Sequence, residues 1–238
     1  MRPIFILILL TTQLTLFGQY IGFQKIEDED VKSWTTNELS DYYGAYHFGD
    51  SETETTLLIF ATENHTIAQI RGGRWNSDFT KWLWNFENFT DFLIYPNGKF
   101  LMGFHKAQFS IYTGYGQQMK CLKIHDPWNW MDESKGIYEL GTKEEAELSD
   151  YFSGNFIEAS ITELNPANLK TLSSQELKLM RNELFARYGY IFKEGGEMEE
   201  HFRKRSWYEP QHTNVDNFLT ELEKENIKLI QTEEANRK

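Results

Sequence analysis

Hydrophobic and polar residues alternate in short segments between residues 38 and 149, and a period of two is typical of β-strands. The segments are rich in β-branched and aromatic residues, and they span residues 42–48, 56–62, 66–70, 81–86, 91–95, 99–104, 107–113 and 118–124. Between two of them lies Pro96-Asn97-Gly98, whose Asn-Gly pair favours a primed hairpin turn. Short strands with tight links predict an antiparallel meander that forms a small barrel or sandwich.

A helical period begins at Ser173. Ser173 and Glu176 have the spacing of a capping box, in which a hydroxyl and a carboxylate each accept a backbone N–H at the start of a helix. The apolar stripe that follows consists of Leu177, Met180, Leu184 and Tyr188. Gly189 then suits the left-handed conformation that ends many helices. The pattern predicts an amphipathic helix over residues 173–188, and a last helix that begins at Asp216 or Asn217.

Two polar residues fall within apolar helical surfaces. Arg181 projects into the stripe of the capped helix, so it needs a carboxylate in a partly dry setting or a path to water. Asn226 lies in the middle of an apolar arc on the last helix and needs hydrogen-bond partners if it is buried. We expect both to be satisfied across the helix interface. Glu183 and Arg187, four residues apart, project to the opposite side and predict a solvent-facing pair worth about 0.3–0.5 kcal/mol.

The C-terminal third carries a family resemblance. The helix LKLMRNELFARYGYIF, the turn SWYEP and the closing helix ENIKLIQ together resemble a YARHG domain over about residues 156–234. The resemblance implies a bacterial extracellular module that is enzymatic or binds the cell wall. Its motif region comprises Arg181, Asn182, Glu183, Phe185, Ala186, Arg187, Tyr188 and Gly189.

Two motif positions depart from the family name. Phe185 replaces the tyrosine, and Tyr188 replaces the histidine. A phenol with a pKa of about 10 is a poor proton acceptor at neutral pH, so this copy could not use the position as a general base. The replacement argues against catalysis by this domain.

The N-terminus has the pattern of a signal peptide, with Arg2, a short apolar stretch and a Phe-Gly-Gln ending that resembles signal sequences of the Bacteroidetes group. We expect export to the periplasm or beyond, with no transmembrane segment after cleavage. The predicted organisation is a signal peptide (1–19), a linker (20–37), a β-rich domain (38–149) and a helical domain (150–238). The fold class is therefore α+β, with a β meander followed by a small all-helical domain.

Charge and composition exclude several functions. A formal net charge of −12 argues against binding to nucleic acid or to anionic membrane surfaces, because both require a basic field. Cys121 is the single cysteine, so no internal disulfide can form, and such a thiol is more often buried than reactive. The 6 histidines lack the short spacings that place two imidazoles on one metal. We predict no metal, no cofactor and no catalytic residue.

Two aromatic segments are candidate binding surfaces. Trp82 and Trp84 point the same way on a strand, where they either pack in the core or form a ligand platform. Arg203, Arg205, Trp207 and Tyr208 place positive charge beside two rings. Arginine forks bind carboxylates or phosphates and a tryptophan can stack on a sugar, although Trp207 could instead fill the helical core.

We therefore expect an exported, non-catalytic module, and the resemblance implies that it binds peptidoglycan or another surface polysaccharide. One alternative is a hydrolase acting on the same material, which predicts convergent polar groups in a pocket. The other is a lipocalin-like binder, which predicts an apolar cavity inside the strands. A wall-binding module instead predicts an aromatic and basic surface near Trp207.

Overall fold

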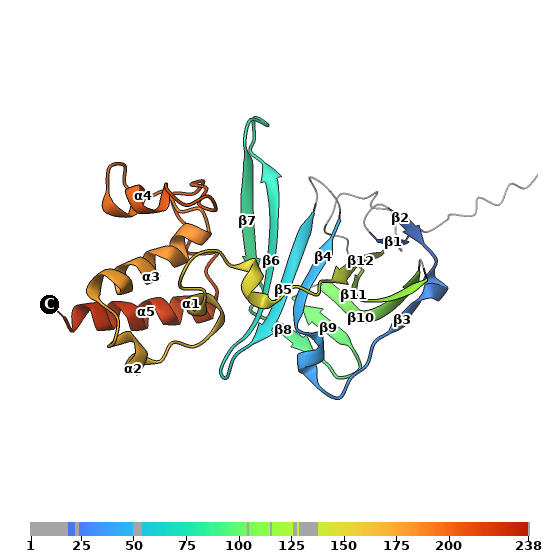
Figure 1. The fold of residues 1–238 in the computed structure, drawn as a ribbon. Coiled ribbons are helices and arrows are strands. Elements are labelled where there is room, and N and C mark those ends of the chain that lie inside the picture. Colours follow the sequence, from blue (N-terminus) through green and yellow to red (C-terminus); the bar gives the residue numbers. More distant parts are fainter. Residues whose placement is uncertain are drawn as a thin grey trace, which may run out of the picture.

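The computed structural model of the chain describes residues 19–21, 24–49, 54–103, 105–114, 116–125, 128 and 138–237. Most of the predicted signal peptide lies outside these residues. A strongly curled sheet forms the N-terminal part, and helices form the C-terminal part beside it (Figure 1). The α+β class predicted from the sequence is confirmed.

The main path of the sheet has the strand order β7-β6-β5-β4-β12-β11-β10-β9-β8, and all neighbours on it pair antiparallel. The sheet curls into an open half-barrel with β7 and β8 at its edges. Its strands are β4 (Gly44–Phe48), β5 (Thr55–Ala61), β6 (Thr66–Trp75), β7 (Trp82–Asn88), β8 (Phe92–Ile94), β9 (Lys99–Met102), β10 (His105–Gly114), β11 (Gln117–Ile124) and β12 (Tyr138–Lys143). Each predicted segment overlaps one of these strands.

Four strands were not predicted, namely β12 and three short strands near the N-terminus. β1 (Gln19–Ile21) pairs parallel with β12 and antiparallel with β2 (Gln24–Ile26). β3 (Val31–Ser33) follows the 3₁₀ helix η1 (Asp28–Asp30) and pairs with β10. The segment predicted to be a linker, residues 20–37, therefore contributes strands to the sheet. These strands of three residues are too short to show an alternating pattern.

The hairpin between β8 and β9 is confirmed, but its turn is not the expected one. Gly98 N–H donates to the carbonyl of Tyr95 (2.8 Å), and Tyr95 N–H donates to that of Lys99 (2.9 Å). Gly98 has φ +81°, while Asn97 does not have the positive φ that a primed two-residue turn requires. The connection is a three-residue loop in which glycine alone takes the left-handed conformation.

Large aromatic side chains fill the inner face of the half-barrel. Tyr42 stacks on Phe109 with ring centroids 4.2 Å apart, and Phe100 stacks on the same ring at 5.5 Å. The phenol of Tyr42 donates to the carbonyls of Trp34 (3.0 Å) and Pro96 (2.9 Å). Tyr46 and its neighbours on other strands are fully buried in the same cluster. The position where a lipocalin-like binder would hold its ligand is occupied by packed rings.

The helical part contains α1 (Glu158–Ile161), α2 (Pro166–Leu169), α3 (Ser174–Arg187), α4 (Glu197–Phe202) and α5 (Glu221–Ala235). The predicted capping box starts α3: Glu176 N–H donates to Ser173 Oγ (3.2 Å) and Ser173 N–H to Glu176 Oε2 (2.6 Å). Gly189 follows with φ +71°. A second capping box, Thr220 with Glu223, starts α5, so neither Asp216 nor Asn217 is its cap.

Arg181 and Asn226, the two polar residues within apolar helical surfaces, have partners on other helices or adjoining segments, as predicted. Arg181 Nε lies 2.8 Å from Glu234 Oε2 on α5, and both side chains are partly buried. Asn226 is buried, donates to the carbonyls of Ala159 (2.9 Å) and Thr162 (2.8 Å), and accepts from Leu164 N–H (3.0 Å). These contacts join α5 to α3 and to the segment around α1.

Candidate functional site

One face of the β6–β7 ribbon meets the helical part. Residues opposite each other across the ribbon include Gln69 and Asn88, Arg71 and Phe86, and Gly73 and Trp84. Since side chains alternate between the faces of a sheet, these three pairs lie on the same face. Gln69 Nε2 donates to the Phe218 carbonyl (2.9 Å), and Asn88 Nδ2 donates to the same carbonyl (3.0 Å). The sheet and the helices are joined here by hydrogen bonds as well as by apolar packing.

A buried polar network continues from this face into the helices. The phenol of Tyr188 donates to Glu223 Oε2 (2.7 Å) and accepts from Gln69 Nε2 (3.2 Å). Glu223 Oε1 accepts from Ser160 Oγ (2.6 Å), and its Oε2 accepts from Thr220 N–H (2.9 Å). All five residues are buried. The network links β6, the end of α3, α1 and the start of α5.

Glu183 and Arg187 form the second half of this network, and the prediction that they face solvent is wrong. Their side chains are 4% and 6% exposed and form an ion pair. Glu183 accepts from the backbone N–H groups of Asn155 (3.0 Å) and Phe156 (2.7 Å). Arg187 donates to the Ser153 carbonyl (2.6 Å) and to Ser160 Oγ (2.7 Å). The segment before α1 covers the side of α3 that a helical projection assigns to water.

The charges of the network are balanced, and their environment decides the protonation of Tyr188. Burial lowers the pKa of Arg187, and the neighbouring Glu183 opposes this effect. Burial also lowers the pKa of Arg71, although a guanidinium keeps its charge at neutral pH. Burial raises the pKa of Tyr188 well above its ordinary value, and the negative charge of Glu223 raises it further. Tyr188 is therefore a neutral hydrogen-bond donor.

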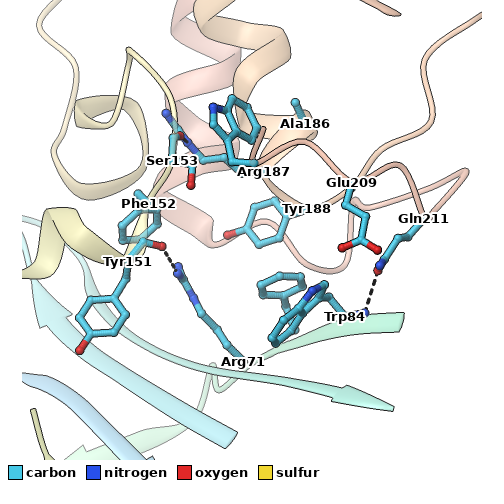
Figure 2. A pocket seen from close by; sticks show the side chains of 13 residues that line it. Arg71, Trp84, Tyr151, Phe152, Ser153, Ala186, Arg187, Tyr188, Glu209 and Gln211 are labelled. Atoms are coloured by element: carbon cyan, nitrogen blue, oxygen red, sulfur yellow. Dashed lines mark hydrogen bonds between the residues drawn. The ribbon is translucent and has the colours of Figure 1, made fainter. Parts of the chain in front are cut away.

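A cleft of about 300 Å³ opens beside this network, between the β6–β7 ribbon and the end of α3 (Figure 2). Arg71 reaches up from β6 into it and donates through Nε to Gln69 (2.9 Å) and through Nη1 to the Tyr151 carbonyl (2.6 Å). Its guanidinium lies 4.3 Å from the centre of the Phe152 ring. Among the residues that the structure describes, Nη2 of Arg71 has no hydrogen-bond acceptor. Arg71 thus places a positive charge in the lining of the cleft.

Aromatic rings also line the cleft. The sheet contributes Trp84 and Phe86, and the helical part contributes Trp207. Gln211 fixes Trp84 by accepting its backbone N–H (2.7 Å), which also satisfies an otherwise open group of the edge strand β7. Glu209 adds a carboxylate at the same site.

The structure brings two of the predicted binding residues together. Trp84 and Trp207 line the same cleft, although they are far apart in sequence. Trp207 also packs against Phe202, with ring centroids 5.9 Å apart, so it contributes both to the helical core and to the cleft. Trp82 lies one step further along the ribbon and contacts Trp75, with ring centroids 5.6 Å apart.

The remaining predicted residues do not line the cleft. Arg203 is exposed and forms an ion pair with Glu199 on α4. Arg205 lies beside His201, with 3.4 Å between Nη2 and Nε2. Tyr208 packs in the small core around Phe202 and donates to the Tyr190 carbonyl (2.7 Å).

Arg71 and Arg187 both line the cleft, and Arg71 was missed by the sequence analysis. It lies one residue beyond the predicted strand 66–70, within a β6 that extends to Trp75. The same face of β6 also carries Gln69 and Gly73, so Arg71 does not stand out from an apolar stripe as Arg181 does in its helix.

Comparison with known proteins agrees with the C-terminal resemblance. Residues 155–235 match the family model of the YARHG domain. The C-terminal region is therefore similar to YARHG domains. Its motif, Phe185 to Gly189, forms the end of α3, and the YARHG residue Tyr188 is the link between the network and the cleft. No curated protein and no solved structure showed a match to the chain.

Proposed function

We propose that this protein is an exported envelope protein that binds peptidoglycan or another surface polysaccharide, without cleaving it, in the cleft between its β6–β7 ribbon and its YARHG domain. The observation that carries the proposal is the shared cleft of Trp84 and Trp207 with Arg71 at its base. A tryptophan ring offers a flat apolar surface to the C–H face of a sugar. A guanidinium with an open N–H binds a carboxylate or phosphate.

The composition of the cleft favours binding over hydrolysis. Glycoside hydrolysis generally uses two carboxylates that flank the scissile bond. Among the described residues that line the cleft, Glu209 is the single carboxylate, and no histidine is present. The phenol of Tyr188 stays protonated and is held by Glu223. The groups present can orient and retain an acidic sugar.

Export is supported by the sequence and by the family. The signal-peptide pattern at residues 1–19 and the YARHG domain both favour the periplasm or the extracellular space, and the signal resembles those of Gram-negative Bacteroidetes. Within the described part of the chain, no helix has the length and apolar character needed to cross a membrane.

The test is sedimentation of the purified mature protein with isolated peptidoglycan sacculi. Trp84→Ala removes a cleft wall that is 39% exposed, so the fold should survive, and we expect the bound fraction to fall severalfold. The matched comparison is the double variant Arg203→Ala with Arg205→Ala, which removes basic groups outside the cleft and should bind like wild type. If the double variant loses binding and Trp84→Ala keeps it, the ligand binds on the α4 surface and the cleft assignment is wrong.

A further inference from the structure

The β6–β7 ribbon continues beyond the sheet. Pairing of β5 with β6 ends at Thr55 and Gly72, whereas pairing of β6 with β7 continues to Trp75 and Trp82. Figure 1 shows the end of this hairpin projecting past the neighbouring strands. Among the residues that the structure describes, no strand pairs with the hairpin end, residues 73–84, on the β5 side.

The projecting part carries the aromatic face of the cleft outward. Alternate residues of each strand lie on this face of the ribbon. They are Arg71, Gly73 and Trp75 on β6 and Trp82, Trp84 and Phe86 on β7. The face that holds Arg71 and Phe86 at the base of the cleft thus reaches Trp84 at its wall and then the Trp75–Trp82 pair outside it. Trp75 is 40% exposed, a fraction similar to that of Trp84.

Gly73 shapes this face. The ring of Trp82 covers it so closely that a Cβ at position 73 would lie 2.2 Å from the indole Cε2. The absence of a side chain lets the indole lie against the ribbon. Any larger residue would push the ring away from the line between Trp84 and Trp75.

The turn holds one more ring at the tip. Phe79 is 77% exposed and has φ +56°, a left-handed conformation that costs a non-glycine residue about 1 kcal/mol or more. Asn76 braces the turn, because its Oδ1 accepts from the N–H groups of Thr80 (2.9 Å) and Lys81 (3.0 Å). An exposed phenylalanine in a braced, strained turn has no core to fill. Such strain is found where a side chain serves binding.

We propose that the hairpin end is an extension of the binding site, and that the ligand is a linear polysaccharide bearing carboxylates. One acidic sugar occupies the cleft, with its carboxylate at Arg71, and the following sugars stack on Trp82, Trp75 and Phe79. The inference rests on the proposed function of the cleft. It adds that the protein distinguishes long glycan strands from short fragments.

Calorimetric titration of the mature protein with two soluble peptidoglycan fragments tests the extension. The probes are the disaccharide unit and glycan strands of many repeats. We expect wild type to bind the strands at least about tenfold more tightly per repeat than the disaccharide. The double variant Trp75→Ala with Phe79→Ala should lose this preference and keep the disaccharide affinity within about twofold, because neither residue lines the cleft.

Two further variants sharpen the result. Gly73→Ala removes no ring but displaces Trp82, so it should also reduce the preference for strands. Tyr95→Ala removes a 39% exposed ring next to the opposite edge strand, β8, and should leave the preference intact. Carboxyl-reduced strands should bind wild type about tenfold more weakly than native strands.

The outcomes separate the two proposals. If wild type prefers strands and the hairpin double variant shows the same preference, the extension is wrong and the cleft stands. Equal per-repeat affinity of wild type for strands and disaccharide also overturns the extension alone. If wild type binds neither probe, the proposed function fails and the extension fails with it.

Discussion

The phenolic O–H of Tyr188 donates a hydrogen bond to Glu223 Oε2 (2.7 Å), and both side chains are buried. This is the motif position that holds histidine in the name of the YARHG family. Because burial raises its pKa, the phenol stays protonated and donates to Glu223, whose carboxylate is a strong acceptor. The contact ties the end of α3 to the start of α5 and, through Gln69, to the sheet.

Tyr188→Phe should therefore destabilise the protein by about 1–3 kcal/mol, because it leaves a buried carboxylate short of a donor. Tyr208→Phe is the matched control, since its phenol donates to the neutral carbonyl of Tyr190 in a partly buried site. We expect a smaller loss there, about 0.5–1.5 kcal/mol. Urea unfolding of both variants measures the difference. Equal losses would contradict a special role for the charged acceptor.

Arg187→Met should lower the free energy of unfolding by more, about 3–5 kcal/mol, because it leaves the buried charge of Glu183 without a partner. Lys224→Met is the control: its partner Glu221 is 60% exposed, so the change should stay within about 1 kcal/mol. Adding Glu183→Gln to Arg187→Met removes the unpaired buried charge. The glutamine still provides an acceptor for the N–H groups of Asn155 and Phe156. The double variant should recover part of the loss. A single variant as stable as wild type would refute a buried pair.

Local signals predicted the elements of this fold well. The capping box of Ser173 and Glu176 marked the start of α3, and the alternating segments marked strands of the half-barrel. These signals succeed because a cap and a strand face are set by residues close in sequence. The short strands β1 to β3 depend on pairing with β12 and β10, and nothing within three residues encodes that pairing.

The candidate site was predicted only in parts. Trp84 and Trp207 were each singled out, but their common cleft depends on docking of the helices against β6 and β7. The burial of Glu183 and Arg187, which a helical projection assigned to solvent, depends on the segment before α1 that covers them. Arg203 and Arg205 looked equally suitable by residue type, yet neither lines the cleft. The sequence indicated which residue types could bind a ligand, but not which of their side chains the fold brings together.

Cys121 supplies a test of the rigidity of the half-barrel. The thiol is buried on β11, and burial raises its pKa to about 12. At pH 8 it is neither ionised nor accessible, so we expect no reaction with a thiol-specific reagent until the sheet opens. The labelling rate of native protein should follow the free energy of unfolding as urea is added. Immediate labelling without denaturant, at the rate of unfolded protein, would show that β11 is open to solvent.

Glu176 makes the stability of α3 depend on pH. The backbone N–H of Ser173, followed by its side chain, holds the pKa of this carboxyl below its ordinary value of 4.5. Since the carboxylate is favoured in the folded state, its stabilising effect is present above the ordinary pKa and is lost as the pH falls through the lower, folded value. Glu176→Gln cannot ionise and lacks this dependence. The advantage of wild type over Glu176→Gln in unfolding free energy should thus be constant near neutral pH and shrink as the pH falls below 4.5.

Glu194→Gln, at an exposed position in the turn before α4, is the control and should show no such trend. Parallel pH profiles for wild type and Glu176→Gln would mean that the carboxylate charge does not contribute to the cap.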